Sequence, residues 1–392
     1  MINITDRTKC CGCYACLNVC PSECIEMKLD SEGFRYPVIN KEKCIKCNAC
    51  ERVCPMLGGA DNVQTQRKGM KSVACYDKDK ESLKKSASGG IGYLISSYII
   101  STGGTVFGVK GNVMDKVVHD MATSQEGIEE FRNSKYLQSH VDDAYKKAKQ
   151  QLNEGKLVFF TGTPCQIAGL YGYLGKDYEN LLTADVICHG VPSEKVFFKY
   201  IKELEAEKGK KVVTMYRDKS AGWKPVQFTY EYEDGTKETN SAYEDIYNKG
   251  FTTNIFQRPS CYKCIFARHD RIGDISIGDW FGGTKYKELD PENNGLSMIT
   301  INSPKGEKFY NLVKDKMFCR EYSMEEATKE SIHLVIPPRM NWMRKAFLKN
   351  VDRVPYKELY KKYFPATKDF VGRIRTWCIR KYYKTFDKDI LK

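Results

Sequence analysis

The sequence predicts a small α+β unit of residues 1–57, followed by a larger α/β domain that extends to residue 335. Ten of the 17 cysteines lie between Cys10 and Cys54, which sets the N-terminal unit apart from the rest. From residue 71 onward, short apolar runs alternate with longer segments of helical composition, as expected of an α/β fold. A chain of 392 residues is long enough for two or three domains.

The composition is that of an ordinary globular protein, with 41% hydrophobic and 29% charged residues. The first ten residues have no apolar core that would indicate a signal peptide. The most apolar early stretch, residues 91–100, is too short for a membrane-spanning helix. We therefore expect a cytoplasmic protein whose thiols are reduced and bound to metal.

Two cysteine motifs of the same spacing, C-x2-C-x2-C-x3-C-P, occupy the N-terminal unit. This frame is typical of two 4Fe-4S clusters of the bacterial ferredoxin type, in which the fourth cysteine of each run binds the other cluster. Two zinc sites are the less favoured alternative. Cys11 and Cys24 fall outside the frame, and we predict that they are small buried residues near a cluster. The predicted ligand sets are Cys10, Cys13, Cys16 and Cys54, and Cys44, Cys47, Cys50 and Cys20.

Four further cysteines fall in three turns of the predicted α/β domain. Cys165 and Cys188 each follow an apolar run, and Cys261 and Cys264 form a C-x2-C pair. Four thiols match the ligand number of a third 4Fe-4S cluster. Zinc remains an alternative for this set.

The strands and helices of the α/β domain are predicted from apolar runs and turn signals. Residues 157–164 and 183–190 are apolar runs closed by turn residues, which is typical of buried strands. Residues 228–240 alternate around Asp234-Gly235, the signal of a β-hairpin. The other predicted elements are strands at 73–78, 105–111 and 274–280 and helices at 88–101, 141–156 and 193–211.

A serine- and glycine-rich turn precedes the helix predicted at 88–101. Ser88, Gly89 and Gly90 would place backbone amides at a helix start, where glycines allow a phosphate to approach closely. Capping of the helix by Ser88 explains the same residues equally well. The G-x-G-x-x-G fingerprint is absent here, so a Rossmann dinucleotide site is not supported.

Six short motifs of the α/β domain, in their order along the chain, resemble those of the coenzyme F-420 hydrogenase/dehydrogenase beta subunit family. Together they cover roughly residues 70–285, and the joint match is specific although each piece alone is not. The motifs are ASGG at 87–90, SKYLQS at 134–139, GTPCQIAGL at 162–170, CHGVPS at 188–193, CYKC at 261–264 and GDISIGDWFG at 273–282.

The resemblance implies an α/β flavin- and cluster-binding catalytic domain that holds FAD beside an iron-sulfur cluster. It implies ligands of this third cluster at Cys165, Cys188, Cys261 and Cys264. Lys135 and His189 are the candidate catalytic residues, although a plain turn role explains His189 as well. The role of Asp279 is open, with a structural one equally favoured. The resemblance implies flavin contacts at Ser88, Gly89, Gly90, Ser134, Lys135, Tyr136, Thr163 and Gln166.

The expected function is that of an oxidoreductase, which passes electrons between 4Fe-4S clusters and a hydride-type donor or acceptor through FAD. The partner would be a redox protein or a soluble electron carrier in an anaerobic cell. The substrate, the direction of electron flow and the use of a deazaflavin coenzyme stay open. The alternative is a non-catalytic electron-transfer subunit without flavin, and some related proteins are linked with surface polysaccharide synthesis.

We expect a linker at residues 58–70 and a division of the beta-subunit-like domain into residues 71–150 and 151–335. A basic helical tail is expected at residues 336–392. From Arg339 onward the chain has 16 Lys and Arg against 5 Asp and Glu.

The apolar residues of this tail suggest one further interaction. Phe370, Ile374 and Trp377 recur at helical spacing between arginines, which would suit peripheral contact with an anionic membrane. Packing of a terminal helix on its own domain is the favoured alternative. Nucleic-acid binding has no supporting motif.

Overall fold

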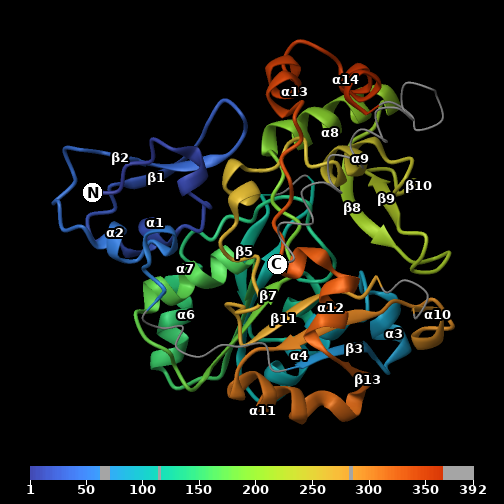
Figure 1. The fold of residues 1–392 in the computed structure, drawn as a ribbon, viewed down its shortest axis with the longest axis horizontal. Helices are drawn as coiled ribbons and strands as arrows, with labels where there is room; N and C mark the ends of the chain where they lie inside the picture. Colours follow the sequence, from blue (N-terminus) through green and yellow to red (C-terminus); the bar gives the residue numbers. More distant parts are fainter. Residues whose placement is uncertain (62–70, 114–115, 282–285, 365–392) are drawn as a thin grey trace.

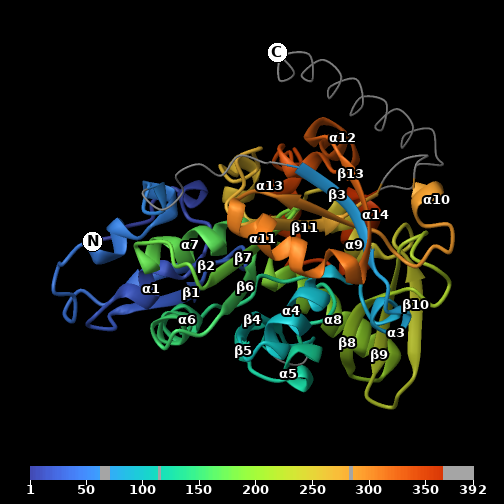
Figure 2. The same cartoon turned by 90° about the horizontal axis from the view of Figure 1, so that it is seen from below.

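The computed structural model describes residues 1–61, 71–113, 116–281 and 286–364. Its described part contains sheets of two, three and eight strands. The eight-stranded sheet forms the centre of the molecule, with the N-terminal unit on one side and the three-stranded sheet on another (Figures 1 and 2).

The N-terminal unit contains one hairpin and two short helices. Strand β1 (Ile25–Leu29) pairs antiparallel with β2 (Arg35–Ile39), so the hairpin expected between the two cysteine motifs is confirmed. The helices are α1 (Ala15–Val19) and α2 (Ala49–Arg52), accompanied by the 3-10 turns η1 (Arg7–Lys9) and η2 (Pro55–Leu57). One cluster of seven buried residues lies within this unit, and five of them are cysteines: Cys16, Cys20, Cys24, Cys50 and Cys54.

The large sheet confirms the predicted α/β domain and makes it a mixed sheet. Its four central strands β11, β7, β6 and β4 are parallel, and the strands outside them pair antiparallel. The spatial order is β13 (Met317–Tyr322), β3 (Lys71–Asp77), β12 (Ser297–Ile301), β11 (Ile275–Asp279), β7 (Leu181–Val186), β6 (Val158–Gly162), β4 (Thr105–Lys110) and β5 (Val118–Ala122).

Helices cover both faces of this sheet because its strands are apolar on both sides. The neighbours Phe159 and Phe160 point to opposite faces and are both fully buried. Phe160 packs on the side of α6 (Ala144–Asn153) and α7 (Pro164–Leu174). Phe159 packs on the side of α4 (Ile91–Ser101), α5 (Gln125–Glu129) and α11 (Pro304–Val313).

A separate core forms around the three-stranded sheet. Strands β8 (Val212–Asp218), β9 (Gln227–Tyr232) and β10 (Lys237–Ser241) are antiparallel, which confirms the predicted hairpin. Helices α8 (Glu194–Lys208), α9 (Ile246–Thr252), α13 (Arg344–Asn350) and α14 (Tyr356–Tyr363) contribute to the same core. The remaining elements are α3 (Lys80–Lys84), α10 (Tyr286–Leu289), α12 (Met324–Glu330), η4 (Pro259–Lys263), η5 (Lys314–Lys316) and η6 (Ile332–Leu334).

Two segments predicted to lie outside the domains begin within the packed structure. Ala60 is buried against the core beneath α7, so the expected linker at 58–70 starts inside the fold. Phe347 and Leu359 are fully buried in the core around α8, because the basic segment also carries apolar residues at helical spacing. The boundary predicted at residue 336 therefore does not separate a tail from the fold.

The residues of the proposed membrane-contacting helix, 370–381, lie outside the described residues. Among the helices that the structure describes, none is both long enough and apolar enough to cross a membrane.

Candidate functional site

The eight predicted ligands of the N-terminal unit form two groups whose members come from both motifs. Cys20 of the first motif shares a small cavity with the second-motif residues Cys44, Cys47 and Cys50. In the other group, burial raises the pKa of Cys16, and the nearby thiols of Cys13, Cys10 and Cys54 raise it further. The fourth cysteine of each motif therefore lies beside cysteines of the other motif, as the predicted ligand sets require.

The thiols of Cys20, Cys44, Cys47 and Cys50 stand around a space. Among the described residues, no three His, Cys, Asp or Glu side chains converge closely enough to hold a single metal ion. A 4Fe-4S cubane is larger than an ion and takes its four thiolates at its corners, so thiols spread around a cavity fit it. Soft thiolates without competing carboxylates are also the donors that iron-sulfur clusters prefer.

The third set of cysteines also lines one small cavity. Cys165 stands in the first turn of α7 directly after β6, Cys188 follows β7, and Cys261 and Cys264 lie in and after η4. Parallel strands β6 and β7 end at the same edge of the sheet, which brings Cys165 and Cys188 together. The set is therefore four thiols around a buried space, which fits a third cluster.

A fifth cysteine, Cys11, lines the same cavity and was predicted only as a buried residue near a cluster. The hydrogen bond from the Cys11 thiol lowers the pKa of Cys165 to about 7, although burial acts in the opposite direction. Thr163 Oγ1 lies 3.2 Å from the Cys165 sulfur. Cys11 follows the first-set ligand Cys10, so two of the three cysteine sets lie next to each other.

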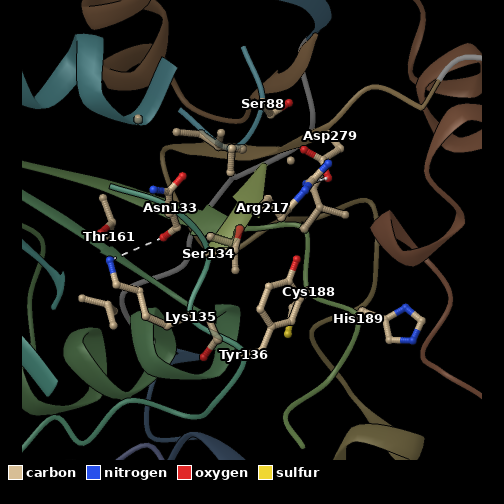
Figure 3. A pocket seen from close by; sticks show the side chains of 18 of the residues that line it. Ser88, Asn133, Ser134, Lys135, Tyr136, Thr161, Cys188, His189, Arg217 and Asp279 are labelled. Carbon is tan, nitrogen blue, oxygen red and sulfur yellow. Dashed lines mark hydrogen bonds and ion pairs between the residues drawn. The ribbon is translucent and has the colours of Figure 1, made fainter. Parts of the chain in front are cut away.

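A cavity of about 650 Å³ opens at the carboxyl ends of β4, β6, β7 and β11. Ligands of open α/β sheets bind at this edge, and the volume is in the range of cofactor sites. Figure 3 shows the side chains that point into it. The predicted flavin contacts that line it are Ser88, Gly90, Ser134, Lys135, Tyr136 and Thr163.

Two predicted flavin contacts do not line the cavity. The Gly89 amide donates to Ser297 Oγ at 2.9 Å, and a Cβ at Gly89 would lie only 2.5 Å from the carbonyl oxygen of Cys75. Gln166 is 1% exposed and forms a capping box with Thr163 at the start of α7. Both residues support the walls of the cavity.

The start of α4 faces the cavity. Gly90 has a φ of +79° and no side chain caps the helix, so α4 begins at Ile91, three residues later than predicted. Ser88 Oγ donates to the carbonyl of Leu296 at 2.9 Å, so it is not the cap that sequence reasoning allowed. A Cβ on Gly92 would meet open space. The first-turn amides of such a helix suit an anionic group.

The candidate catalytic residue Lys135 is held by its own loop. Its Nζ donates to the carbonyl oxygens of Arg132 at 2.5 Å and Glu130 at 3.0 Å. Burial lowers the pKa of Lys135 to about 8. Lys135 thus fixes the loop that presents Ser134 and Tyr136 to the cavity.

The second candidate, His189, lies beside Cys188 at the edge of the cavity (Figure 3). Its ring packs edge-on against His333, with 4.3 Å between ring centroids. Burial, with a smaller contribution from His333, lowers the pKa of His189 to about 4, so the imidazole is neutral at pH 7. Its buried Nε2 has no hydrogen-bond partner within the part of the chain that the structure describes.

Sequence reasoning missed Arg217, which no motif marks. It reaches the cavity from β8 and pairs with Asp279 at the end of β11, with 2.6 Å between Nη1 and Oδ2. The Tyr136 hydroxyl points toward this pair (Figure 3). Arg217 Nη2 is buried without a hydrogen-bond partner among the described residues. At this end of the cavity Asp279 balances the charge of Arg217, and Arg217 Nη2 offers a hydrogen-bond donor.

The two cavities have a common wall. Cys188, Gly190, Val191 and His333 line both the large cavity and the third cysteine set. On its other side, the third set is bordered by Cys11 and Met56, which belong to the N-terminal unit. The large cavity, the third set and the first set thus follow one another through the molecule.

Comparison with known proteins agrees with this division of the chain. Residues 155–327 match the family described as the C terminus of the coenzyme F420 hydrogenase/dehydrogenase beta subunit. Residues 9–57 match the 4Fe-4S dicluster domain. No curated protein matches the chain.

Among solved structures, the chain is similar to a chain of the xenon-derivatised F420-reducing [NiFe] hydrogenase complex from Methanosarcina barkeri. The two are 20% identical, with 75% of this chain and 91% of that chain covered and a TM-score of 0.46. The resemblance expected from the six motifs and the paired cysteine frame is confirmed by the two family matches. The chain is therefore similar to the 4Fe-4S dicluster domain over residues 9–57 and to the C terminus of the coenzyme F420 hydrogenase/dehydrogenase beta subunit over residues 155–327.

Proposed function

We propose that this chain is an iron-sulfur flavoprotein oxidoreductase, with FAD in the large cavity and three 4Fe-4S clusters on the three cysteine sets. The observation that carries the proposal is the common wall of the two cavities. A site large enough for FAD touches the third cysteine set through Cys188, and that set touches the dicluster domain through Cys11. Electrons could therefore pass between the cavity and the dicluster domain without leaving the protein.

The serine- and glycine-rich end of the cavity is suited to the pyrophosphate of FAD. The first-turn amides of α4 would donate to it, and Gly92 leaves room for close approach. The Arg132 guanidinium donates to Ser86 Oγ at 2.9 Å and lies 3.3 Å from the centroid of the Tyr93 ring, which holds its charge beside these amides. Arg132 also pairs with Glu129, with 2.6 Å between Nε and Oε2, and thus supports the wall of this site.

The opposite end of the cavity is suited to redox chemistry. Bound FAD would exchange a hydride with a small molecule and single electrons with iron-sulfur clusters. Tyr136 packs edge-on against Phe228 and Phe251, with ring centroids 5.1 and 5.8 Å away, and these rings exclude water from this end. His189 Nε2 is the group that we assign to hydrogen bonding with the bound substrate.

The second cysteine set is where electrons would enter or leave. Cys47 is exposed, in contrast to the buried Cys20 and Cys50 of the same set, and Ile45 beside it is 65% exposed. Exposed Lys43 and Lys46 flank this surface. A small redox protein or a soluble electron carrier with an acidic surface would fit here.

Metal and flavin analysis of protein purified without oxygen tests the proposal. We expect about twelve iron atoms per chain, as three 4Fe-4S clusters require, and equimolar FAD released by acid. Twelve iron atoms without flavin would support an electron-transfer subunit that lacks FAD. About eight iron atoms together with zinc would assign zinc to the third set and contradict the proposal.

A variant of the third set sharpens this test. Cys188→Ser should lower the iron content to about eight atoms per chain and leave the dicluster signals in low-temperature EPR. Cys319→Ser is the matched control, because Cys319 lies half-buried on β13, away from all three sets. An unchanged iron content in Cys188→Ser would remove that residue from the ligand set.

A further inference from the structure

Arg258 lies at the junction between the dicluster domain and the third cysteine set. It precedes Cys261 by three residues, yet its side chain extends to the loop of the first set and is 1% exposed. Its Nε donates to the carbonyl of Cys10 at 2.9 Å, and Nη2 donates to the carbonyl of Arg35 at 2.8 Å. The same Nη2 lies 3.6 Å from Cys10 Sγ, within hydrogen-bond distance of a sulfur.

No carboxylate of the described residues forms an ion pair with this buried charge. Within the described residues, the partners of Arg258 are carbonyl oxygens, the amide oxygen of Gln138 at 3.3 Å and the Cys10 sulfur. The guanidinium also lies over the Tyr36 ring, 4.4 Å from its centroid. Burial of an unpaired guanidinium is costly, so a negative charge is expected close by. Thiolates of the first and third sets, Cys10 and Cys261, are the groups that could supply it.

The backbone of the first set is shaped to admit this side chain. Gly12 has a φ of +68°, and a Cβ at this position would lie 2.9 Å from Arg258 Nη1. Gly12 stands between Cys11 and the ligand Cys13 in the motif, where the spacing rule leaves its identity free. The glycine is therefore explained by the arginine that packs over it.

We infer that Arg258 is a positioning residue that raises the reduction potential of the cluster held by Cys10, Cys13, Cys16 and Cys54. Reduction adds one electron, and hence one negative charge, to a cluster and its thiolates, and no proton has to follow. A fixed guanidinium that donates to Cys10 Sγ stabilises this added charge. Because Arg258 donates a hydrogen bond to Cys10 Sγ, whereas only its charge acts on Cys261, the effect is larger on the first set than on the third. The inference rests on the proposed clusters and not on the flavin.

The test is a redox titration with dithionite under anaerobic conditions, followed by low-temperature EPR. Arg258→Gln removes the charge and keeps a hydrogen-bonding side chain, so one dicluster signal should move to lower potential while the other stays in place. Arg258→Lys keeps the charge without the planar fork and should give a smaller shift in the same direction.

Arg344→Gln is the matched control for a loosened junction. Arg344 donates to the carbonyl of Gln257, next to Arg258, and pairs with Glu32 of the dicluster domain at 2.6 Å, and no cysteine of the described residues is among its hydrogen-bond partners. Both dicluster signals should keep their potentials in this variant. An equal shift in Arg344→Gln, or no shift in Arg258→Gln with its full iron content, would overturn the inference.

The iron content of the variants decides the outcome if a substitution damages the cluster site. If Arg258→Gln loses iron and Arg258→Lys keeps it, the result supports the role of the charge. If both variants lose iron equally, the inference is overturned, because Arg258 then has only a structural role. Wild-type protein without cluster signals would instead contradict the proposed function, so the two failures are distinguishable.

Discussion

The dicluster domain and the third cysteine set both bury thiols, but they do so by opposite means. In the dicluster domain, cysteines make up five of the seven residues of one buried cluster. The third set lies on the edge of an eight-stranded sheet whose two faces are filled by apolar side chains without it. The difference suggests that the dicluster domain depends on its clusters for folding, whereas the large domain folds without the cluster of the third set.

The largest expected effect is on resistance to proteolysis when one predicted cluster ligand is replaced in each region. Cys50→Ser should cost about four iron atoms and also expose the outer half of the dicluster domain to proteases, because metal binding and folding are coupled there. Cys188→Ser should lose as much iron and keep its resistance to proteolysis. Equal cleavage of the two variants in limited proteolysis would break the comparison.

The hydrogen bonds of Tyr145 to the dicluster domain and the start of α7 give the next largest expected effect on stability. The buried Tyr145 hydroxyl on α6 lies 2.9 Å from the carbonyl of Cys13 and 2.7 Å from that of Gln166. Tyr145→Phe leaves both carbonyls without this donor and should lower the free energy of unfolding by about 1–3 kcal/mol. Urea unfolding of anaerobic protein measures it. Tyr173→Phe on α7 is the control and should have a much smaller effect.

The buried lysine of the cavity loop predicts a pH dependence of stability. The pKa of Lys135 is about 8 in the folded protein and returns to its ordinary value of 10.5 on unfolding. Between pH 8 and 10.5 the unfolded chain binds the extra proton, so the contribution of Lys135 to stability increases with pH across this range. Below pH 8 both states are charged and the burial cost is constant.

Lys135→Met should therefore flatten the rise in the free energy of unfolding between pH 8 and 10.5. Lys80→Met, at a side chain that is 74% exposed, should leave the slope as it is in the wild type. A slope that is the same in all three proteins would show that the Lys135 ammonium keeps its ordinary pKa in the fold.

The smallest expected effect on stability is that of Gly92→Ala, which should increase folding stability and decrease flavin binding. Gly92 lies inside α4, where a Cβ would meet open space at the cavity, so Gly92→Ala should stabilise the helix by about 0.5–1 kcal/mol. The same methyl group would stand in the proposed pyrophosphate site and should reduce the flavin retained. Gly172→Ala on α7 is the contrast and should destabilise, because its Cβ would lie 2.3 Å from the carbonyl oxygen of Val53.

The sequence predicts most of the architecture but less of the cavity. The dicluster ligands follow from local spacing, because one loop wraps three corners of a cubane. Strands β6 and β7 could be recognised because their apolar runs end at turn residues. The start of α4 was misplaced by three residues, since the positive φ of Gly90 ends the preceding turn later than the pattern indicates.

The groups that sequence reasoning missed come from elements far away along the chain. Arg217 reaches the cavity from β8, and Arg258 reaches Cys10 across 248 positions. Neither lies in a motif. Cys11 was predicted as a buried residue, but its place in the wall of the third set depends on how the dicluster domain packs against α7. Such residues become visible only when the tertiary contacts are known.

The order of the sites, from the cavity through the third set to the dicluster domain, is the central claim, and light-driven reduction tests it most directly. Illumination with EDTA reduces bound flavin, and freeze-quenched EPR then follows the dicluster signals in the wild type and in Cys264→Ser. The account predicts that these signals develop in the wild type and fail to develop in the variant, although dithionite still produces them in both. Dicluster signals that develop equally fast in Cys264→Ser would contradict it.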